Sequence, residues 1–269
     1  MPELPEVETI RRSLLDNENA VLDKIEILHP GVVRRQDFQP GSLHGKTIAK
    51  IDRRGKFLIF SFAQSSGYLI VHMGMSGRFY MVNHDQPLTE KHIHAVLYLD
   101  NGRRLVYQDP RRFGGLWFVT DIEEFFCRMG CEPLEDEFNP ELLAKLVKDR
   151  KVAIKTLLLN QNLIAGIGNI YADEALFAAG ILPHRPAGSL TREEIERLSQ
   201  AIKKVLAESI EQRGTTFRDY RDGLNQSGSF QDYLKVYGRC HEPCPVCGQP
   251  IVRERIGGRS SHYCQHCQH

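Results

Sequence analysis

The sequence lacks the features of a membrane or secreted protein. No stretch of its 269 residues is long and apolar enough to span a bilayer, and charged residues occupy the N-terminus where a signal peptide would be apolar. We therefore expect a cytoplasmic protein with no membrane partner. An internal repeat is also absent, and the length suits one large domain or two of ordinary size, each with its own core.

A strong excess of charge of either sign is missing as well. The 35 lysines and arginines nearly balance the 34 acidic residues, and the net charge of +1 gives weak support for nucleic-acid binding. The basic residues are clustered, however. The clusters are Arg11-Arg12, Arg34-Arg35, Arg53-Arg54-Gly55-Lys56, Arg103-Arg104 and Arg111-Arg112. One cluster alone is typical of a solvated surface, whereas several beside turns favour a distributed phosphate-binding surface.

Cysteine is scarce until the C-terminus, where five of the seven cysteines lie within the last thirty residues. They include two Cys-x-x-Cys knuckles, Cys244 with Cys247 and Cys264 with Cys267. This spacing predicts a tetrahedral four-thiolate site for one structural Zn²⁺, which would supply folding free energy to a segment too short to bury much core. The residues between the knuckles suit a β-hairpin that turns at Gly257-Gly258. Cys127 and Cys131, at a poor spacing for a metal, are expected to be buried thiols.

The N-terminus reads MPELPEVETI, with proline as the second residue. Proline suits the first turn of a helix, and acidic residues there complement the helix dipole. Apolar residues at helical spacing predict an amphipathic helix through about residue 15. This interpretation explains a helix and leaves open whether the terminus itself does chemistry.

Short runs rich in β-branched and aromatic residues follow this helix. The expected strands are 21–28, 46–51, 56–63, 68–73, 95–99, 104–108 and 116–120. They indicate an antiparallel sandwich or barrel. The later pattern is helical, with expected helices at 140–148, 151–159, 170–179 and 191–212. Thr191 followed by Glu194 is typical of a helix start, and the whole chain predicts an α+β protein.

Three further motifs each allow a structural and a chemical interpretation. Gly166-x-Gly168 before a helix suits either a phosphate seat or a plain helix–turn–helix, and it lacks the third glycine of a dinucleotide fingerprint. The run DPRRFG at 109–114 is either a β-turn with one core phenylalanine or a wedge that enters a DNA stack. The run HMGMSG at 72–77 places Met75 either in the core or on a turn.

Together these motifs resemble those of the bacterial formamidopyrimidine-DNA glycosylases, base-excision enzymes for oxidised purines. The resemblance covers essentially the whole chain. Its motifs, in the family's order and spacing, are PELPEVET, RRGKFL, HMGMSG, DPRRFG, AGIGNIYADE, VYGR and the four-cysteine finger.

The resemblance implies three domains and a partner. Residues 1–132 would form an N-terminal β-sandwich catalytic domain with a leading helix. Residues 133–237 would form a helical helix–two-turn–helix domain with a lesion-covering loop, and residues 238–269 a β-hairpin zinc finger. The partner would be damaged double-stranded DNA in the bacterial cytoplasm, bound by a monomer.

The resemblance also implies chemistry for the N-terminus. Once Met1 is removed, the amine of Pro2 would attack the anomeric carbon, expel the damaged base and form an iminium ion. A terminal amine has a reference pKa of about 7.7–8.0, so a useful fraction is neutral near pH 7. The iminium would acidify the neighbouring sugar carbon, and β,δ-elimination would cleave the strand. Glu3 would be the general acid/base and Lys56 the catalytic-site lysine, and Glu6 is expected to face the same cleft.

Other site residues are implied by position. Met75, Arg111 and Phe113 would fill the space left by an everted nucleotide. The implied contacts to DNA come from His92, Arg111, Arg112, Lys155, Asn169 and Arg259. Residues 215–237 resemble the family's loop over an everted purine, with Thr215, Arg218 and Tyr237 as implied site residues.

Two alternatives stay open. Endonuclease VIII shares the terminal proline chemistry and prefers damaged pyrimidines, whereas the PELPEVET start and the loop favour oxidised purines. A catalytically silent zinc-finger protein that binds bent or damaged DNA is a rival of another class. The set of Pro2, Glu3 and Lys56 argues against it.

Overall fold

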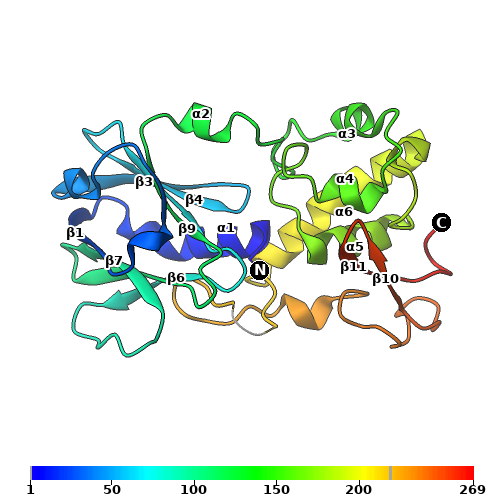
Figure 1. Ribbon diagram of the computed structural model, residues 1–269. Coiled ribbons are helices and arrows are strands. Elements are labelled where there is room, and N and C mark those ends of the chain that lie inside the picture. The colour runs from blue at the N-terminus through cyan, green and yellow to red at the C-terminus, as the bar shows by residue number, and fades with distance from the viewer. Residues whose placement is uncertain (1, 218–219) are drawn as a thin grey trace. The chain divides into compact units, whose positions relative to one another are not determined.

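The structure, a computed structural model, describes residues 2–217 and 220–269. The chain divides into two compact units, shown in Figure 1. Unit 1 comprises Met1–Arg128 and Gln212–Gln231, and unit 2 comprises Met129–Glu211 and Asp232–His269. A search of the described residues for membrane-spanning helices found none with the length and apolar character required.

Unit 1 is built on a sheet that has nine strands in the described part of the chain. The strands are β1 (Val21–Ile27), β2 (Val33–Gln36), β3 (Lys46–Arg54), β4 (Phe57–Phe62), β5 (Tyr68–His72), β6 (Arg78–Asn83), β7 (Ile93–Leu99), β8 (Arg103–Gln108) and β9 (Gly115–Val119). Their order is β2-β9-β5-β4-β3-β1-β7-β8-β6. Neighbouring strands are antiparallel, except that β2 runs parallel to β9.

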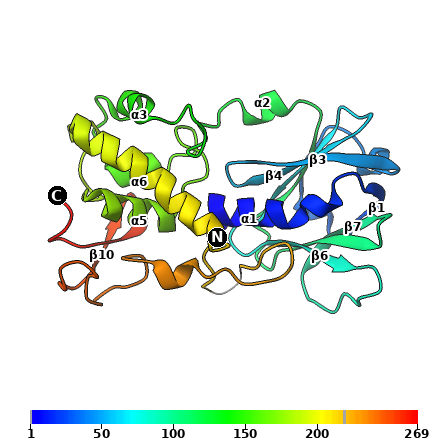
Figure 2. The ribbon, with the colours of Figure 1, turned by 180° about the vertical axis from the view of Figure 1, so that it is seen from behind.

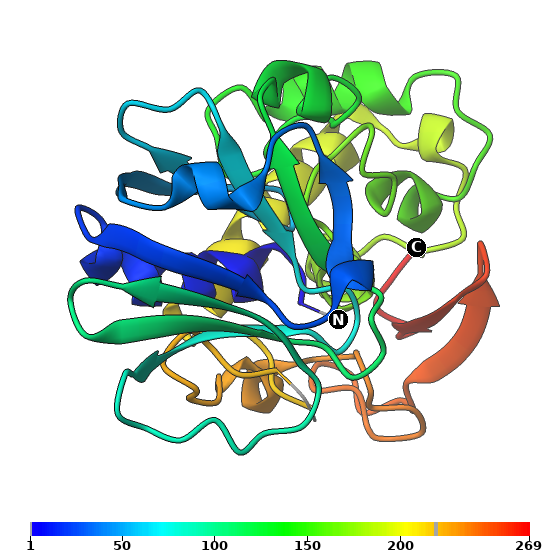
Figure 3. The ribbon, with the colours of Figure 1, turned by 60° about the vertical axis from the view of Figure 1, so that its left-hand side comes forward.

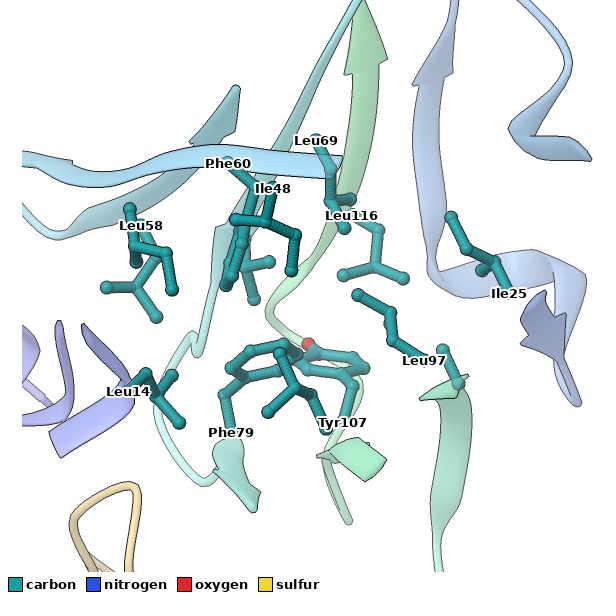
Figure 4. Close-up of a cluster of buried hydrophobic side chains, with 14 of the residues drawn as sticks. Leu14, Ile25, Ile48, Leu58, Phe60, Leu69, Phe79, Leu97, Tyr107 and Leu116 are labelled. Carbon is teal, nitrogen blue, oxygen red and sulfur yellow. The ribbon is translucent and has the colours of Figure 1, made fainter. Parts of the chain in front are cut away.

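The sheet folds into two facing layers. The pairing of β1 with β3 is short, joining Val21 to Thr47 and Leu22 to Lys46, and the strands on either side of it face each other. Figure 4 shows side chains of the two layers, such as Phe60 and Phe79, pointing toward one another. Fully buried aliphatic and aromatic side chains from both layers form one core. The predicted α+β fold with an N-terminal sandwich is therefore confirmed.

Helix α1 (Leu4–Leu14) closes this core, packing against β3, β4 and β6 (Figure 1). Leu4, Val7, Ile10 and Leu14 are all fully buried, because their spacing of three and four residues puts them on one helical face. The predicted N-terminal helix is confirmed. Unit 1 also contains the short helix α2 (Ile122–Phe126).

Unit 2 combines helices with a β-hairpin. Its helices are α3 (Pro140–Val147), α4 (Ile154–Leu158), α5 (Asn169–Ala179) and α6 (Arg192–Glu211), and its strands are β10 (Val252–Ile256) and β11 (Arg259–Tyr263). Helix α5 packs along α6 (Figure 2) and against β11. Thr191 caps α6, since its Oγ1 accepts from the Glu194 N–H at 3.3 Å and the Glu194 carboxylate accepts from the Thr191 N–H at 2.8 Å.

The predicted hairpin of the C-terminal segment is confirmed (Figure 3). Strands β10 and β11 pair antiparallel and turn at Gly257 and Gly258, whose φ angles are +56° and +80°. Two successive left-handed residues are what a tight two-residue hairpin requires, and glycine adopts them without a steric cost.

Two strands were not predicted. Strand β2 has the sequence VRRQ, and strand β6 begins directly after the HMGMSG run. Both lie at edges of the sheet and pair on one side only, so neither needs the continuous apolar pattern of a central strand. The helix expected at 151–159 is also shorter, since α4 begins at Ile154 and ends at Leu158.

Replacing Phe60 with alanine should destabilise unit 1 strongly. Its ring is fully buried and lies edge-on to Phe79 with centroids 5.7 Å apart. The expected loss of unfolding free energy is about 3–5 kcal/mol. Urea unfolding followed by fluorescence of Trp117, the single tryptophan, measures this loss within unit 1. Leu28→Ala is the matched control, because Leu28 is 53% exposed and should change stability by less than about 0.5 kcal/mol.

Candidate functional site

The first turn of α1 is fixed by a pair of glutamates. Glu3 is the N-cap residue, and its side chain accepts a hydrogen bond from the Glu6 N–H. The Glu6 carboxylate accepts in return from the Glu3 N–H at 2.8 Å. Both carboxylates are buried, with Glu3 3% and Glu6 1% exposed. This reciprocal cap holds the backbone directly after Pro2 in a defined position.

Glu6 also holds a segment from the far end of unit 1. Its second carboxylate oxygen accepts from the Thr215 N–H at 2.7 Å. Gly214 allows this segment to approach Glu6, because a Cβ at residue 214 would lie 2.8 Å from the Glu6 carboxylate. The φ angle of Gly214, +79°, also favours glycine. The Tyr220 hydroxyl donates to the Glu6 backbone carbonyl at 3.3 Å, and burial raises the pKa of Tyr220 well above its usual value. The structure thus brings Glu3, Glu6 and Thr215 together.

Lys56 follows a tight turn between β3 and β4. Gly55 has a φ of +55°, and its carbonyl accepts from the Arg53 guanidinium at 3.0 Å. Arg53 also forms an ion pair with Glu8 of α1, with Nε and Oε2 3.2 Å apart. The turn that carries buried Lys56 is therefore tied to the helix that begins next to Pro2.

His72 is a site candidate that the sequence did not indicate. It lies at the end of β5, opposite Phe57 in the sheet, and its Nδ1 accepts from the Gly74 N–H at 3.1 Å. Burial and, to a smaller extent, the nearby positive charge of Lys56 lower the pKa of His72 to about 4, against a still smaller opposing effect of Asp109. His72 is consequently neutral near pH 7.

The two runs 72–77 and 109–114 form turns that present apolar side chains to solvent. Phe113 is 62% and Met75 44% exposed, so neither is a core residue. Arg111 and Arg112 directly precede Phe113 in the chain and are exposed as well. The alternative interpretations that put Phe113 and Met75 in the core are therefore wrong.

Arginine and histidine side chains cover the outer side of the 109–114 turn. Arg34 Nε donates to the Gly114 carbonyl at 3.0 Å, and its Nη2 donates to the Arg112 carbonyl at 2.5 Å. Arg112 has a φ of +54°, and its Nη1 lies 2.6 Å from His29 Nε2. The backbone of His92 adjoins the start of this turn, because the His92 carbonyl accepts from the Asp109 N–H at 3.1 Å. The side chains of Arg34, Arg112 and His92 are exposed and that of His29 is half-buried, so basic side chains belong to or contact this part of the fold.

In unit 2, Lys155 lies in a buried ionic network. Its side chain is fully buried, with Nζ 2.6 Å from Asp173 Oδ1 and donating to the Ser260 carbonyl at 2.6 Å. Asp173 also accepts from the His262 N–H at 2.9 Å. A lysine of α4, an aspartate of α5 and the strand β11 are thereby joined.

Asn169 and Arg259 lie beside this network. Asn169 begins α5, and its Nδ2 donates to Ser260 Oγ at 3.4 Å, next to the exposed Arg259. Gly166, before the helix, has a φ of +86° and donates its N–H to Gln161 Oε1 at 2.9 Å. The structure therefore brings Asn169 and the hairpin together at a helix N-terminus, where an anion is favoured.

Tyr237 is held by a buried carboxylate of α5. Glu174 accepts from the backbone N–H groups of Lys235, Val236 and Tyr237 at 2.8–2.9 Å. Burial raises the pKa of Glu174, although these hydrogen bonds lower it in part. The Tyr237 ring lies edge-on to the His262 ring, with centroids 5.0 Å apart.

The four cysteines of the two knuckles come together in unit 2. Their Sγ atoms all lie within 4.8 Å of one another, and the Cys244–Cys267 and Cys247–Cys264 pairs are 3.8 and 3.4 Å apart. A tetrahedral zinc with Zn–S bonds of about 2.3 Å needs sulfurs about 3.8 Å apart, so the donor set fits this ion.

Three family models match the sequence. Residues 1–116 match the formamidopyrimidine-DNA glycosylase N-terminal domain, residues 129–221 the formamidopyrimidine-DNA glycosylase H2TH domain, and residues 242–269 the zinc finger found in FPG and IleRS. The formamidopyrimidine-DNA glycosylase of Syntrophomonas wolfei is 53% identical over 268 residues, covering 100% of both chains.

This chain belongs to the formamidopyrimidine-DNA glycosylase family. Solved structures of the family are similar over its whole length. A variant of Lactococcus lactis FPG in complex with a Fapy-dG containing DNA matches with a TM-score of 0.92 and 36% identity, covering 99% of each chain. MutM in complex with carbocyclic 8-oxo-G containing DNA matches with a TM-score of 0.91 and 35% identity, also covering 99% of each chain.

The match to the family's zinc finger assigns the cysteine cluster. Cys244, Cys247, Cys264 and Cys267 form the site of one structural Zn²⁺, as the sequence predicts. The other cysteines differ from expectation. Cys127 is exposed rather than buried, because it follows the short surface helix α2, and Cys131 is half-buried with its Sγ donating to the Leu163 carbonyl at 3.2 Å.

Some predicted glycosylase residues cannot be placed, and some placed residues were not predicted. Met1 and Arg218 lie outside the described residues. His72 and Asp173 were missed, although each lies within a quoted motif, HMGMSG or AGIGNIYADE. Both could have been found by considering every titratable side chain inside a motif as a candidate site residue.

Cys247→Ser should remove most of the zinc from this glycosylase-family chain. A serine hydroxyl is a far poorer zinc ligand than a thiolate, so three sulfurs would hold the ion weakly. Elemental analysis should find about one zinc per chain in the unchanged protein, in keeping with a single four-ligand site. Cys240→Ser is the matched control and should keep its zinc. Full zinc in the Cys247→Ser protein would contradict the assignment.

His72→Gln should flatten the acid dependence of stability. The unfolded state binds a proton on His72 near pH 6.5, whereas the folded state does so only near pH 4. Between pH 6.5 and pH 4 only the unfolded state protonates His72. The free energy of unfolding is therefore highest above pH 6.5 and falls by roughly 3 kcal/mol as the pH drops toward 4. Urea unfolding from pH 7 to pH 5, followed by Trp117 fluorescence, measures the slope. The exposed His84→Gln serves as control, and equal slopes in both variants would refute the buried neutral state of His72.

Proposed function

We propose that the protein is a bifunctional base-excision enzyme that removes oxidised purines from duplex DNA and then cleaves the strand. The observation that carries the proposal is the N-terminal turn. Its buried pair of glutamates fixes the backbone directly after Pro2, and Glu6 also holds Thr215. Relatives with the same fold were solved with Fapy-dG and carbocyclic 8-oxo-G DNA, which supports oxidised purines as the substrate.

Pro2 is the proposed nucleophile, acting after removal of Met1. Its neutral secondary amine attacks the anomeric carbon, the base leaves, and an iminium ion joins the enzyme to the sugar. Because the iminium draws electrons from the neighbouring carbon, β- and δ-elimination can follow and release the phosphates. A retained Met1 would turn the nitrogen into an amide and abolish this chemistry.

Glu3 and Lys56 are the proposed partners of Pro2. The Glu3 carboxylate lies on the residue next to the nucleophile, so it suits proton transfer to and from the opened sugar. The turn that carries Lys56 is tied to α1 through Arg53 and Glu8. The positive charge of Lys56 would favour binding of a phosphate beside the reacting sugar.

The exposed turns of unit 1 suit contact with a distorted duplex. We propose that Met75, Arg111 and Phe113 enter the space left by the everted nucleotide, and that Arg111 also contacts the partner base. His92 and Arg112 would bind flanking phosphates. Exposed apolar side chains together with exposed arginines can unstack bases while neutralising the phosphate backbone.

In unit 2, Asn169 and Arg259 are the proposed phosphate contacts. For Lys155 the burial of its ammonium favours an indirect role, in which it fixes the strand that carries Arg259 rather than donating to DNA itself. Thr215 and Tyr237 would position the two ends of the loop over the lesion, with Arg218 between them.

We further propose that the protein works as a cytoplasmic monomer, with domains at residues 1–132, 133–237 and 238–269.

A trapping experiment tests this proposal. The protein, with Met1 removal verified by mass spectrometry, is incubated with a duplex containing one 8-oxoguanine opposite cytosine, and borohydride is added to reduce any iminium. We expect a covalent adduct that peptide mapping places on Pro2. A protein that retains Met1 is the matched control and should give none, and Glu3→Gln should bind the duplex without excising the base.

A parallel duplex with thymine glycol separates the alternatives. Stronger trapping on thymine glycol would favour the endonuclease VIII activity over oxidised purines. An adduct on a lysine would remove Pro2 from the mechanism. No adduct on either duplex, from processed and zinc-loaded protein, would favour a silent DNA-binding protein.

A further inference from the structure

The turns at 72–77 and 109–114 carry exposed apolar side chains and yet have defined conformations. Met75 and Phe113 are 44% and 62% exposed, so burial of their own side chains contributes little to holding either turn. A wedge that entered DNA from a mobile turn would lose conformational entropy at the moment of binding. Some other interaction must order these turns beforehand.

Asp109 supplies that interaction. It is fully buried, and one of its carboxylate oxygens accepts from Ser76 Oγ at 2.8 Å and from the Arg111 N–H at 3.3 Å. The other oxygen accepts from the Gly114 N–H at 2.9 Å. Ser76 directly follows Met75, and Gly114 directly follows Phe113. One carboxylate therefore contacts the chain next to each member of the proposed wedge.

Further groups fix Asp109 itself. The Tyr107 hydroxyl lies 3.4 Å from its second carboxylate oxygen, and burial raises the pKa of Tyr107 far above neutrality, so the hydroxyl remains a donor. His94 Nε2 lies 2.9 Å from the Asp109 carbonyl, and the Asp109 N–H donates to the His92 carbonyl at 3.1 Å. Hydrogen bonds from these side-chain and backbone donors compensate the buried carboxylate for its loss of contact with water.

The two turns also interlock through their backbones. A Cβ on Gly74 would lie 2.3 Å from the Gly114 nitrogen, and one on Gly114 would lie 2.1 Å from the His72 carbonyl oxygen. Contacts this short require glycine at both positions. The Asp109 carboxylate bonds to both turns at this point of close approach, so their positions are coupled.

We infer that Asp109 is a positioning residue for DNA eversion: it holds Met75, Arg111 and Phe113 in place before the duplex binds. The inference rests on the proposed function, because it assigns Asp109 to a wedge that acts during base excision. Asp109 touches neither the reacting sugar nor the base in this role. Its effect should therefore depend on whether the substrate must be everted from a stack.

Asp109→Asn tests this dependence. The amide keeps the shape of the side chain but turns an N–H group toward donors that need an acceptor, which weakens the coupling of the turns. Single-turnover excision from the 8-oxoguanine–cytosine duplex should slow by about ten- to hundredfold. Cleavage of an abasic site in single-stranded DNA, where no base must leave a stack, should change by less than about twofold.

The same substitution in a Phe113→Ala protein provides a double-mutant cycle. If Asp109 acts through the wedge, its replacement should slow duplex excision by less than about threefold once the phenylalanine is absent. A full, additive loss in that background would overturn the inference. So would an equal loss on the single-stranded abasic substrate, which would indicate a general structural defect.

Folding of each variant is checked by zinc content and by urea unfolding followed by Trp117 fluorescence. Should Asp109→Asn fail to fold, Ser76→Ala removes a single donor to the same carboxylate and should give a smaller loss with the same substrate dependence. A Ser76→Ala protein that excises and cleaves like the unchanged protein would contradict the inference. Failure of the unchanged protein to excise 8-oxoguanine would instead count against the proposed function.

Discussion

The N-terminal turn of unit 1 depends on the carboxylate of Glu6. One oxygen closes the cap at the start of α1 and the other accepts from Thr215, more than two hundred residues along the chain. Because both bonds end on one buried side chain, the position of the N-terminus is tied to a segment far along the chain. Proline as the second residue suits this arrangement, because it adds rigidity where the chain begins.

Buried carboxylates play the same part elsewhere. Asp109 joins two turns of unit 1, Asp173 joins α4 and α5 to the hairpin, and Glu174 holds the segment at Tyr237. Each accepts at least one backbone N–H group, from turn or loop residues for Asp109 and Glu174 and from strand β11 for Asp173. Loops near a DNA-binding surface cannot bury much apolar area, and such hydrogen bonds are an alternative means of ordering them.

Local patterns allowed much of this structure to be predicted, since α1, the hairpin and the zinc cluster follow from spacing within short segments. The edge strands β2 and β6 could not, because pairing on one side imposes little pattern. Long-range hydrogen bonds could not be predicted either. The sequence identifies Lys155 only as a basic residue, whereas its buried side chain is paired with Asp173 and with Ser260, one hundred and five residues later. The motifs indicated candidate site residues, and only the fold shows which of them meet.

The exposure of Phe113 and Met75 also bears on how the free protein behaves in solution. Apolar side chains at the tips of turns are suited to contacts between copies, and a net charge of +1 gives the whole chain little electrostatic repulsion. Solubility at this surface then depends on the local charges of Arg111 and Arg112. Salt screens charges over roughly 8 Å at physiological ionic strength, and salts such as sulfate strengthen apolar association. Colloidal stability of the DNA-free protein is therefore coupled to ionic strength through the same side chains that would meet the duplex.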